Sequence, residues 1–246
     1  MEVIGHRGDP ARAPENTLAA MASAIQAQVQ MVEFDVQLTR DGQAVVVHDE
    51  GLGRTVRGGG LVGDLTFEEL QRLDAGGWYS SEFAGERVPS LAQVLELLAP
   101  SGISANLELK TNVIPYPGLV AQVVKELEQA GMSDRVIISS FNHKTLKEVQ
   151  ALSPGLACAA LVDIQLVAPW EYLLQHGFQA LHILHSACTA EDVEACQERD
   201  LAVRVWTVDD EVGARRFFEM GVDGLVTNNP EKMSRWVTHW QGVEKG

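Results

Sequence analysis

Short apolar runs alternate with amphipathic segments along this chain, a pattern typical of βα units. The apolar runs predict strands at residues 3–6, 32–38, 105–109, 136–139, 157–162, 180–184, 203–208 and 224–227. Helical periodicity follows most of them, at residues 17–29, 119–129, 144–151, 190–199 and 212–219. Eight strands close a parallel barrel, and the length of 246 residues is that of one such domain. We therefore predict an α/β protein, a (β/α)8 TIM barrel in which residues 1–246 form one domain, rather than an open doubly wound sheet.

One further apolar run, residues 44–48, follows the second predicted strand across Asp41-Gly42. Asp-Gly between two alternating runs is a strong signal for a two-residue hairpin turn. With these two residues in the turn, His48 pairs with Asp35, about 5 Å away on the same face of the hairpin. A one-residue bulge would break this register.

Some 55 residues separate His48 from the third barrel strand, which is too many for a plain crossover. Within them, residues 51–90 contain three successive glycines from Gly58, the aromatic residues Trp78, Tyr79 and Phe83, and a short helical pattern at 67–73. We expect this segment to be an insertion that caps the barrel mouth, where loops often set specificity. The alternative is a decorative loop with a small core of its own.

Composition narrows the classes of partner and compartment. The net charge of −15 repels phosphate backbones and anionic lipid surfaces, so we expect neither nucleic-acid binding nor stable membrane association. No apolar stretch reaches ~18 residues, and the first residues predict a strand of the mature fold rather than a signal peptide. With neither a spanning segment nor a signal peptide, we expect a cytoplasmic location. The three cysteines have no C-x-x-C pair and are expected to be reduced core residues rather than disulfides or a zinc site.

Carboxylates lie at the carboxyl ends of two predicted strands, where TIM barrels place their active sites. Glu33 and Asp35 are two apart in the second strand, as Glu108 and Lys110 are in the third, so each pair shares a face. Three converging carboxylates suit a hard divalent cation, Mg²⁺, Ca²⁺ or Mn²⁺. The alternative is an ion network in which these carboxylates pair with Lys110 and Arg7 without a metal.

His6 and His48 are the candidate acid and base. Displacing an alkoxide from a phosphodiester requires a proton for the leaving oxygen, and two imidazoles can give one proton and take another. Arg7, next to His6, would donate to a phosphate oxygen. The other five histidines, His143, His176, His182, His185 and His239, are interpreted as structural or surface residues. The chain lacks H-E-x-x-H, G-x-S-x-G, Walker A and G-x-G-x-x-G motifs, which disfavours zincins, serine hydrolases and nucleotide-binding proteins.

Taken in order, these motifs resemble those of the glycerophosphodiester phosphodiesterases. The matching segments cover nearly the whole chain: His6-Arg7-Gly8, Pro14-Glu15-Asn16-Thr17, Glu33-Phe34-Asp35-Val36, Asp41-Gly42, His48-Asp49, Arg54-Thr55, Leu73-Asp74-Ala75-Gly76, Asn106-Leu107-Glu108-Leu109-Lys110, Ser139-Ser140-Phe141 and Val205-Trp206-Thr207-Val208. One departure is Val56, where the family often has a small or polar residue, and it bears on the preferred alcohol more than on the chemistry.

The resemblance implies hydrolysis of small-molecule glycerophosphodiesters to glycerol 3-phosphate and an alcohol. It also implies that His6 and His48 form a general acid–base pair, without saying which is the acid, and that Glu33, Asp35 and Glu108 are the metal ligands. Arg7 and Lys110 would then contact the phosphate, and Phe141 and Trp206 would line the substrate cleft. Asn16 would cap the first helix and orient the first loop.

Two rival functions remain open at this stage. A phospholipase D-type or lysophospholipase D activity on lysophospholipids would need an apolar, membrane-seeking rim, against which the acidic charge counts. A non-catalytic binding protein on the same fold would be expected to have lost part of the constellation. The oligomeric state is not predicted.

Overall fold

The computed structural model describes residues 1–243 and confirms the closed barrel. The strands are β1 (Glu2–Gly5), β2 (Met31–Leu38), β3 (Ala44–Val46), β4 (Ser104–Leu109), β5 (Val136–Ser140), β6 (Ala157–Val162), β7 (Ala180–Leu184), β8 (Ala202–Trp206) and β9 (Gly224–Thr227). All except β3 run parallel in the order β1-β9-β8-β7-β6-β5-β4-β2, and pairing of β1 with β2 closes the ring. Small apolar side chains such as Ala159 and Ala180 fill its interior.

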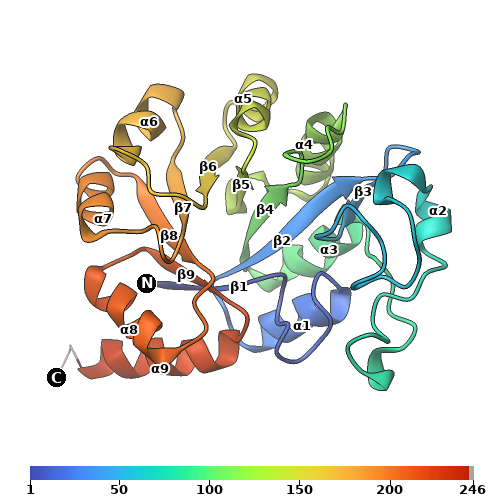
Figure 1. Ribbon diagram of the computed structural model, residues 1–246, viewed down its shortest axis with the longest axis horizontal. Coiled ribbons are helices and arrows are strands. Elements are labelled where there is room, and N and C mark those ends of the chain that lie inside the picture. Colours follow the sequence, from blue (N-terminus) through green and yellow to red (C-terminus); the bar gives the residue numbers. More distant parts are fainter. Residues whose placement is uncertain (244–246) are drawn as a thin grey trace.

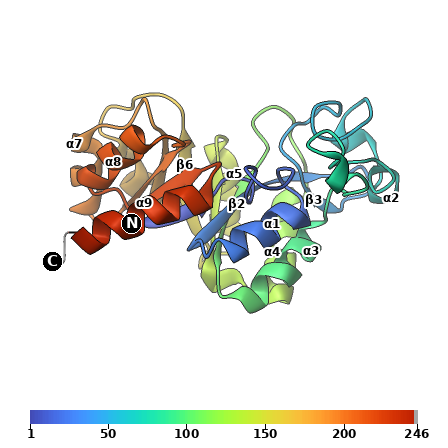
Figure 2. The same ribbon diagram turned by 90° about the horizontal axis from the view of Figure 1, so that it is seen from below.

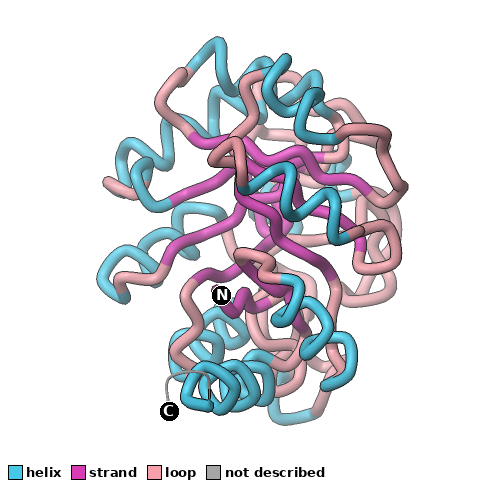
Figure 3. The backbone as a smooth tube through the Cα atoms, turned by 90° about the vertical axis from the view of Figure 1, so that its left-hand side faces the viewer, coloured by secondary structure: helices cyan, strands magenta, loops and turns pink. Residues whose placement is uncertain are grey.

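Helices surround this ring on its outer side (Figure 1 and Figure 3). They are α1 (Leu18–Gln26), α3 (Leu91–Leu98), α4 (Leu119–Ala130), α5 (His143–Leu152), α6 (Pro169–His176), α7 (Ala190–Gln197), α8 (Glu211–Met220) and α9 (Pro230–Val243). The short helix α2 (Phe67–Leu70) lies outside this ring, beside β3, and short 3-10 turns occur at Val62–Asp64, Ser81–Phe83, Ala99–Ser101 and Ser133–Arg135. Gly131, Gly177 and Gly221 end three helices in the left-handed conformation, as their sequence positions indicate. The main hydrophobic core lies between these helices and the strands.

The hairpin between β2 and β3 exists, but its predicted register is wrong by one residue. The observed pairs are Val36 with Val46 and Leu38 with Ala44, so the loop has three residues and not two. Gly42 adopts φ +81°, and its N–H donates to the carbonyl of Thr39, which is the three-residue turn with a left-handed last position. This turn leaves Val47, not His48, beside Asp35.

Residues 51–90 pack beside the barrel on the β3 side, on the opposite side of the molecule from α7 and α8 (Figure 2). Their apolar side chains join Val45 and Val47 in a separate satellite core, formed with Val56, Val62, Leu70, Ala75 and Val88. The three cysteines are buried and free, as expected. None of the described helices is long and apolar enough to traverse a lipid bilayer.

Candidate active site

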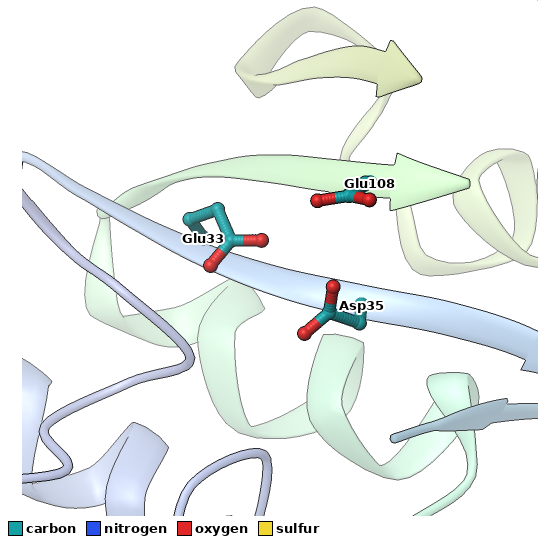
Figure 4. A group of neighbouring side chains, drawn as sticks. All are labelled: Glu33, Asp35 and Glu108. Carbon is teal, nitrogen blue, oxygen red and sulfur yellow. The ribbon is translucent and has the colours of Figure 1, made fainter. Parts of the chain in front are cut away.

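Three buried carboxylates converge from two neighbouring barrel strands (Figure 4). Glu33 and Asp35 come from β2 and Glu108 from β4, and the parallel register places Asp35 beside Glu108. One oxygen from each lies within 4.8 Å of one from each of the others. The predicted period-two spacing therefore places Glu33 and Asp35 on one face of β2, where Glu108 of β4 joins them.

The cations around these carboxylates are too few to neutralise all three. Lys110 Nζ lies 2.8 Å from Glu108 Oε1 and 3.7 Å from Asp35 Oδ1, and Arg7 Nε lies 3.4 Å from Asp35 Oδ2. Glu33 accepts a hydrogen bond only from the backbone N–H of Arg7 among the described residues, at 2.9 Å. An ion network without metal therefore satisfies Asp35 and Glu108 better than Glu33.

The electrostatics of the three carboxyl groups differ accordingly. Burial, with the negative charge of Asp35, raises the pKa of Glu33 well above its usual value and that of Glu108 to about 7. Burial also opposes ionisation of Asp35, but the charges of Arg7, His48 and Lys110 outweigh it and lower the pKa of Asp35. The site thus concentrates negative charge that burial makes unfavourable unless a further cation joins it.

The donor set fits a hard divalent cation. All three side chains offer oxygen, the ligand atom that Mg²⁺, Ca²⁺ and Mn²⁺ prefer. Asp35 Oδ1 is buried and has no hydrogen-bond partner among the described residues. An unpartnered, buried carboxylate oxygen beside two others is the arrangement that a bound cation would satisfy.

His6 follows β1 and is held in one orientation by a chain of hydrogen bonds. Its Nδ1 lies 2.7 Å from Asn228 Oδ1, while Asn228 Nδ2 donates to Asp209 Oδ2 at 2.7 Å. Because the Asn228 amide donates to a carboxylate, its oxygen must accept, so Nδ1 of His6 carries the proton. Burial and the charge of Arg7 lower the pKa of His6 to about 4. The ring is therefore neutral at pH 7, with the unprotonated Nε2 4.0 Å from Glu33.

His48 follows β3 and enters the same pocket despite the shifted register. Its Nδ1 donates to Asp49 Oδ1 at 2.6 Å, and Asp49 is fixed by Arg54 Nε at 2.6 Å. Arg54 also bonds both oxygens of Glu15, at 2.8 and 3.0 Å. The Asp49 carboxylate can stabilise positive charge on His48, so the two histidines have different electrostatic surroundings.

The loop after β1 connects these groups through unusual backbone conformations. Arg7 has φ +55°, which turns its N–H toward Glu33, and its side chain donates to Glu15 at 2.7 Å. Gly8 has φ +91°, and a Cβ there would lie 2.7–2.8 Å from atoms of Ala20 in α1. Glycine is therefore required at this position by both backbone conformation and space.

The expected role of Asn16 as a helix cap is wrong. Thr17 caps α1, with its hydroxyl accepting from the N–H of Ala20. Asn16 instead adopts φ +60° and binds Asp35 twice, donating from Nδ2 to Oδ2 at 2.8 Å and accepting the backbone N–H at 3.3 Å. The side chain orients a carboxylate of the site, because the loop that carries it folds over β2.

One pocket, with a cavity volume of about 80 Å³, unites the predicted residues. Its wall contains His6, Arg7, Glu33, His48, Glu108, Lys110, Phe141 and Trp206. The Phe141 and Trp206 rings meet edge to face, with centroids 5.7 Å apart and planes at 82°. Asp35 lies directly behind this wall, in contact with Arg7 and Lys110.

Two further polar residues of the wall, Asn106 and His182, were not predicted as site residues. Asn106 Nδ2 lies 3.4 Å from His182 Nδ1 across the barrel, and burial lowers the pKa of His182 well below its usual value. Asn106 Oδ1 and His182 Nε2 are buried without partners among the described residues, as is Nε1 of Trp206. The available signal was their place in the strands, since Asn106 is two residues before Glu108 and so shares its face.

Comparison with known proteins agrees with this site. Residues 6–232 match the glycerophosphoryl diester phosphodiesterase family. A glycerophosphodiester phosphodiesterase of Caldanaerobacter subterraneus is 40% identical, over 94% of this chain and 95% of its own length, and one from Bacillus altitudinis is 36% identical, over 94% and 96%. The structure of an Oleispira antarctica phosphodiesterase in complex with the product sn-glycerol-3-phosphate superposes with a TM-score of 0.91, at 34% identity and 97% coverage of both chains. The chain therefore belongs to the glycerophosphoryl diester phosphodiesterase family of phosphoric diester hydrolases.

Proposed function

We propose that this enzyme hydrolyses glycerophosphodiesters to glycerol 3-phosphate and an alcohol, with a divalent metal ion and with His6 and His48 as general base and acid. The observation on which this proposal rests is that two differently held histidines share one pocket with a buried carboxylate triad. Family membership and the product complex of the Oleispira antarctica relative support the substrate class.

The three carboxylates, Glu33, Asp35 and Glu108, would hold the ion, which when bound offsets negative charge on the phosphate oxygens. Arg7 and Lys110 line the same pocket and would donate their remaining N–H groups to the phosphate. Both cations are already oriented by carboxylates, so they would bind the diester without first losing conformational freedom.

The histidines would move the two protons. His6 presents an unprotonated Nε2, fixed through Asn228, and would take a proton from the nucleophile. The nucleophile is either a water molecule or the neighbouring hydroxyl of the glycerol, which would give a cyclic phosphate that water then opens. His48, with Asp49 beside Nδ1, would deliver a proton from Nε2 to the oxygen of the departing alcohol. Phe141 and Trp206 would form an apolar wall that excludes water from one side of the substrate.

We also propose that residues 51–90 form one domain with the barrel and cap its mouth. Arg54, which belongs to this segment, binds Asp49 next to His48 and Glu15 next to Arg7. Through Arg54 the segment would thereby fix both the loop that carries His48 and the loop that carries Arg7. The free, buried cysteines are those of a protein from a reducing compartment, and we propose the cytoplasm.

The experiment is to measure release of glycerol 3-phosphate from glycerophosphocholine and glycerophosphoethanolamine, first with chelator and then with Mg²⁺, Ca²⁺ or Mn²⁺. The same assay is applied to His6→Ala and Glu108→Ala, with His239→Ala and Glu219→Ala as exposed controls. Turnover that requires metal and is lost only in the first two variants supports the proposal. Turnover that survives the chelator and either site substitution contradicts it.

A further inference from the structure

A second hollow opens beside the catalytic pocket, where β6 leads into α6. Its cavity volume is about 370 Å³, and its walls are mostly apolar. They contain the segment from Leu161 to Val167 together with the rings of Phe141 and Tyr172. Ile164 is 61% exposed and Val167 99% exposed, so this apolar surface is uncovered in the free protein.

The two hollows are neighbours, because Phe141 and Leu161 line both. Loops after barrel strands lie on the catalytic face, so the hollow opens on the side from which the substrate enters. An alcohol bound in this hollow would therefore lie next to a phosphate group held between Phe141 and the carboxylate triad.

The polarity of the two hollows indicates which part of the diester each one binds. The catalytic pocket is lined by three residues with buried polar atoms that lack hydrogen-bond partners among the described residues, Asn106 Oδ1, His182 Nε2 and Trp206 Nε1. Glycerol hydroxyl groups would satisfy such atoms, which favours glycerol in the catalytic pocket and the alcohol in the outer hollow.

The chemistry of the outer hollow is that of a cation site. Asp163 is exposed at its rim, and no lysine or arginine contributes to its described wall. Burial lowers the pKa of His143 and so favours the neutral ring. Its Nε2 donates to the carbonyl of Leu161 at 3.2 Å, and its Nδ1 therefore accepts from the Tyr172 hydroxyl at 2.7 Å. A carboxylate that lines the same hollow as two aromatic rings attracts ammonium groups and repels anions.

We propose that this hollow, the alcohol subsite, binds the alcohol of the substrate and selects alcohols that bear an ammonium group, such as choline and ethanolamine, over neutral or anionic ones. The inference rests on the proposed function and adds to it a residue that determines specificity, Asp163. Asp163 touches none of the groups assigned to metal binding or proton transfer, so its replacement leaves the catalytic machinery intact.

The test is the ratio of kcat/KM for glycerophosphocholine to kcat/KM for glycerophosphoglycerol, whose alcohol is neutral. Reversing a charge at about 6 Å from an ammonium group in water-like surroundings changes this ratio by about tenfold. We expect Asp163→Lys to lower the ratio by about tenfold, and Ile164→Lys to lower it in the same direction. The change should lie mainly in KM. Asp134→Lys, an exposed position before β5, changes the net charge equally and should leave the ratio unchanged.

A ratio that is the same in Asp163→Lys as in Asp134→Lys overturns the proposal, because the hollow then does not contact the alcohol. An equal loss for both substrates overturns it as well, since it indicates an effect on the phosphate or the fold. Wild-type protein that releases no glycerol 3-phosphate with any metal contradicts the proposed function itself, which is a different outcome.

Discussion

Replacing Glu108 by glutamine in the metal-free protein removes one buried charge and almost no volume. The Glu108 side chain accepts from Lys110 Nζ at 2.8 Å, and an amide oxygen can accept the same bond. What the substitution removes is the unfavourable ionisation of a carboxyl group that is 8% exposed and lies next to Asp35. We therefore expect the variant to be more stable than the wild type at pH 8 when metal is absent.

The magnitude follows from the pKa. Burial and the charge of Asp35 raise the pKa of Glu108 to about 7 from its usual 4.5. At about 1.4 kcal/mol for each pH unit, ionising the group in the folded protein costs about 3 kcal/mol. Because the folded pKa is raised, the cost is absent below pH 4.5, grows between pH 4.5 and 7, and is complete above pH 7.

The assay is urea unfolding in chelator at pH 5 and pH 8. Glu108→Gln should exceed the wild type by about 3 kcal/mol at pH 8 and by less than about 1 kcal/mol at pH 5. Adding metal at a thousand times its Kd should reverse the order, because the ion then stabilises the wild type by about 4.1 kcal/mol, more than the ionisation cost of about 3 kcal/mol, and the variant lacks one ligand.

Glu126→Gln is the matched control. Glu126 is also buried, and burial raises its pKa. It differs from Glu108 because it lies outside the carboxylate triad and accepts hydrogen bonds from Gln122 and Gln43. Metal should not alter the effect of that substitution. The reasoning is refuted if Glu108→Gln is less stable than the wild type at pH 8 in chelator, or if its advantage is the same at both pH values.

Three further predictions test single contacts. His48→Ala should lower kcat for glycerophosphocholine by about 10²–10⁴-fold but much less for a diester whose leaving group is p-nitrophenolate, which needs no proton; equal losses would show that His48 is not the acid. Asn16→Ala removes both hydrogen bonds to Asp35 and should weaken metal binding by about 10–100-fold in calorimetry, whereas unchanged affinity would contradict this orienting role. Gly8→Ala should destabilise the protein by at least about 2 kcal/mol in urea unfolding, because its Cβ would collide with Ala20, and a neutral effect would contradict the required close approach.

The barrel and the cluster of carboxylates could be predicted from the sequence because both depend on short-range periodicity, whereas Phe141 and Trp206 were expected only from the family resemblance. Apolar runs define the strands, and spacing of two places Glu33 with Asp35 on one face. The hairpin register could not be predicted in the same way. Asp41-Gly42 is compatible with turns of two or three residues, and the choice depends on how β3 packs against residues 89 and 90.

His182 shows a second limit. Its spacing of three from His185 indicated no shared face, which is correct, but the relevant neighbour lies on another strand. His182 lies in the middle of β7, two residues after Ala180 and therefore on the same interior face. Its Nδ1 lies 3.4 Å from Nδ2 of Asn106 in β4. Contacts across a barrel join residues far apart in sequence, so a single chain without its fold does not reveal them.

Because of the hairpin, the proposed catalytic residues belong to two structural units, the barrel and the satellite core. His6 and the carboxylates lie on or directly after barrel strands, whereas His48 follows β3, whose residues Val45 and Val47 pack in the satellite core. Opening of that core would withdraw one histidine while the barrel and its ion ligands remain folded, a form of local unfolding with its own free energy. In a denaturant titration, activity would then disappear before the helical signal, and hydrogen exchange in residues 44–48 would be faster than in β4. Substitutions in the satellite core could thus tune turnover without changing metal affinity.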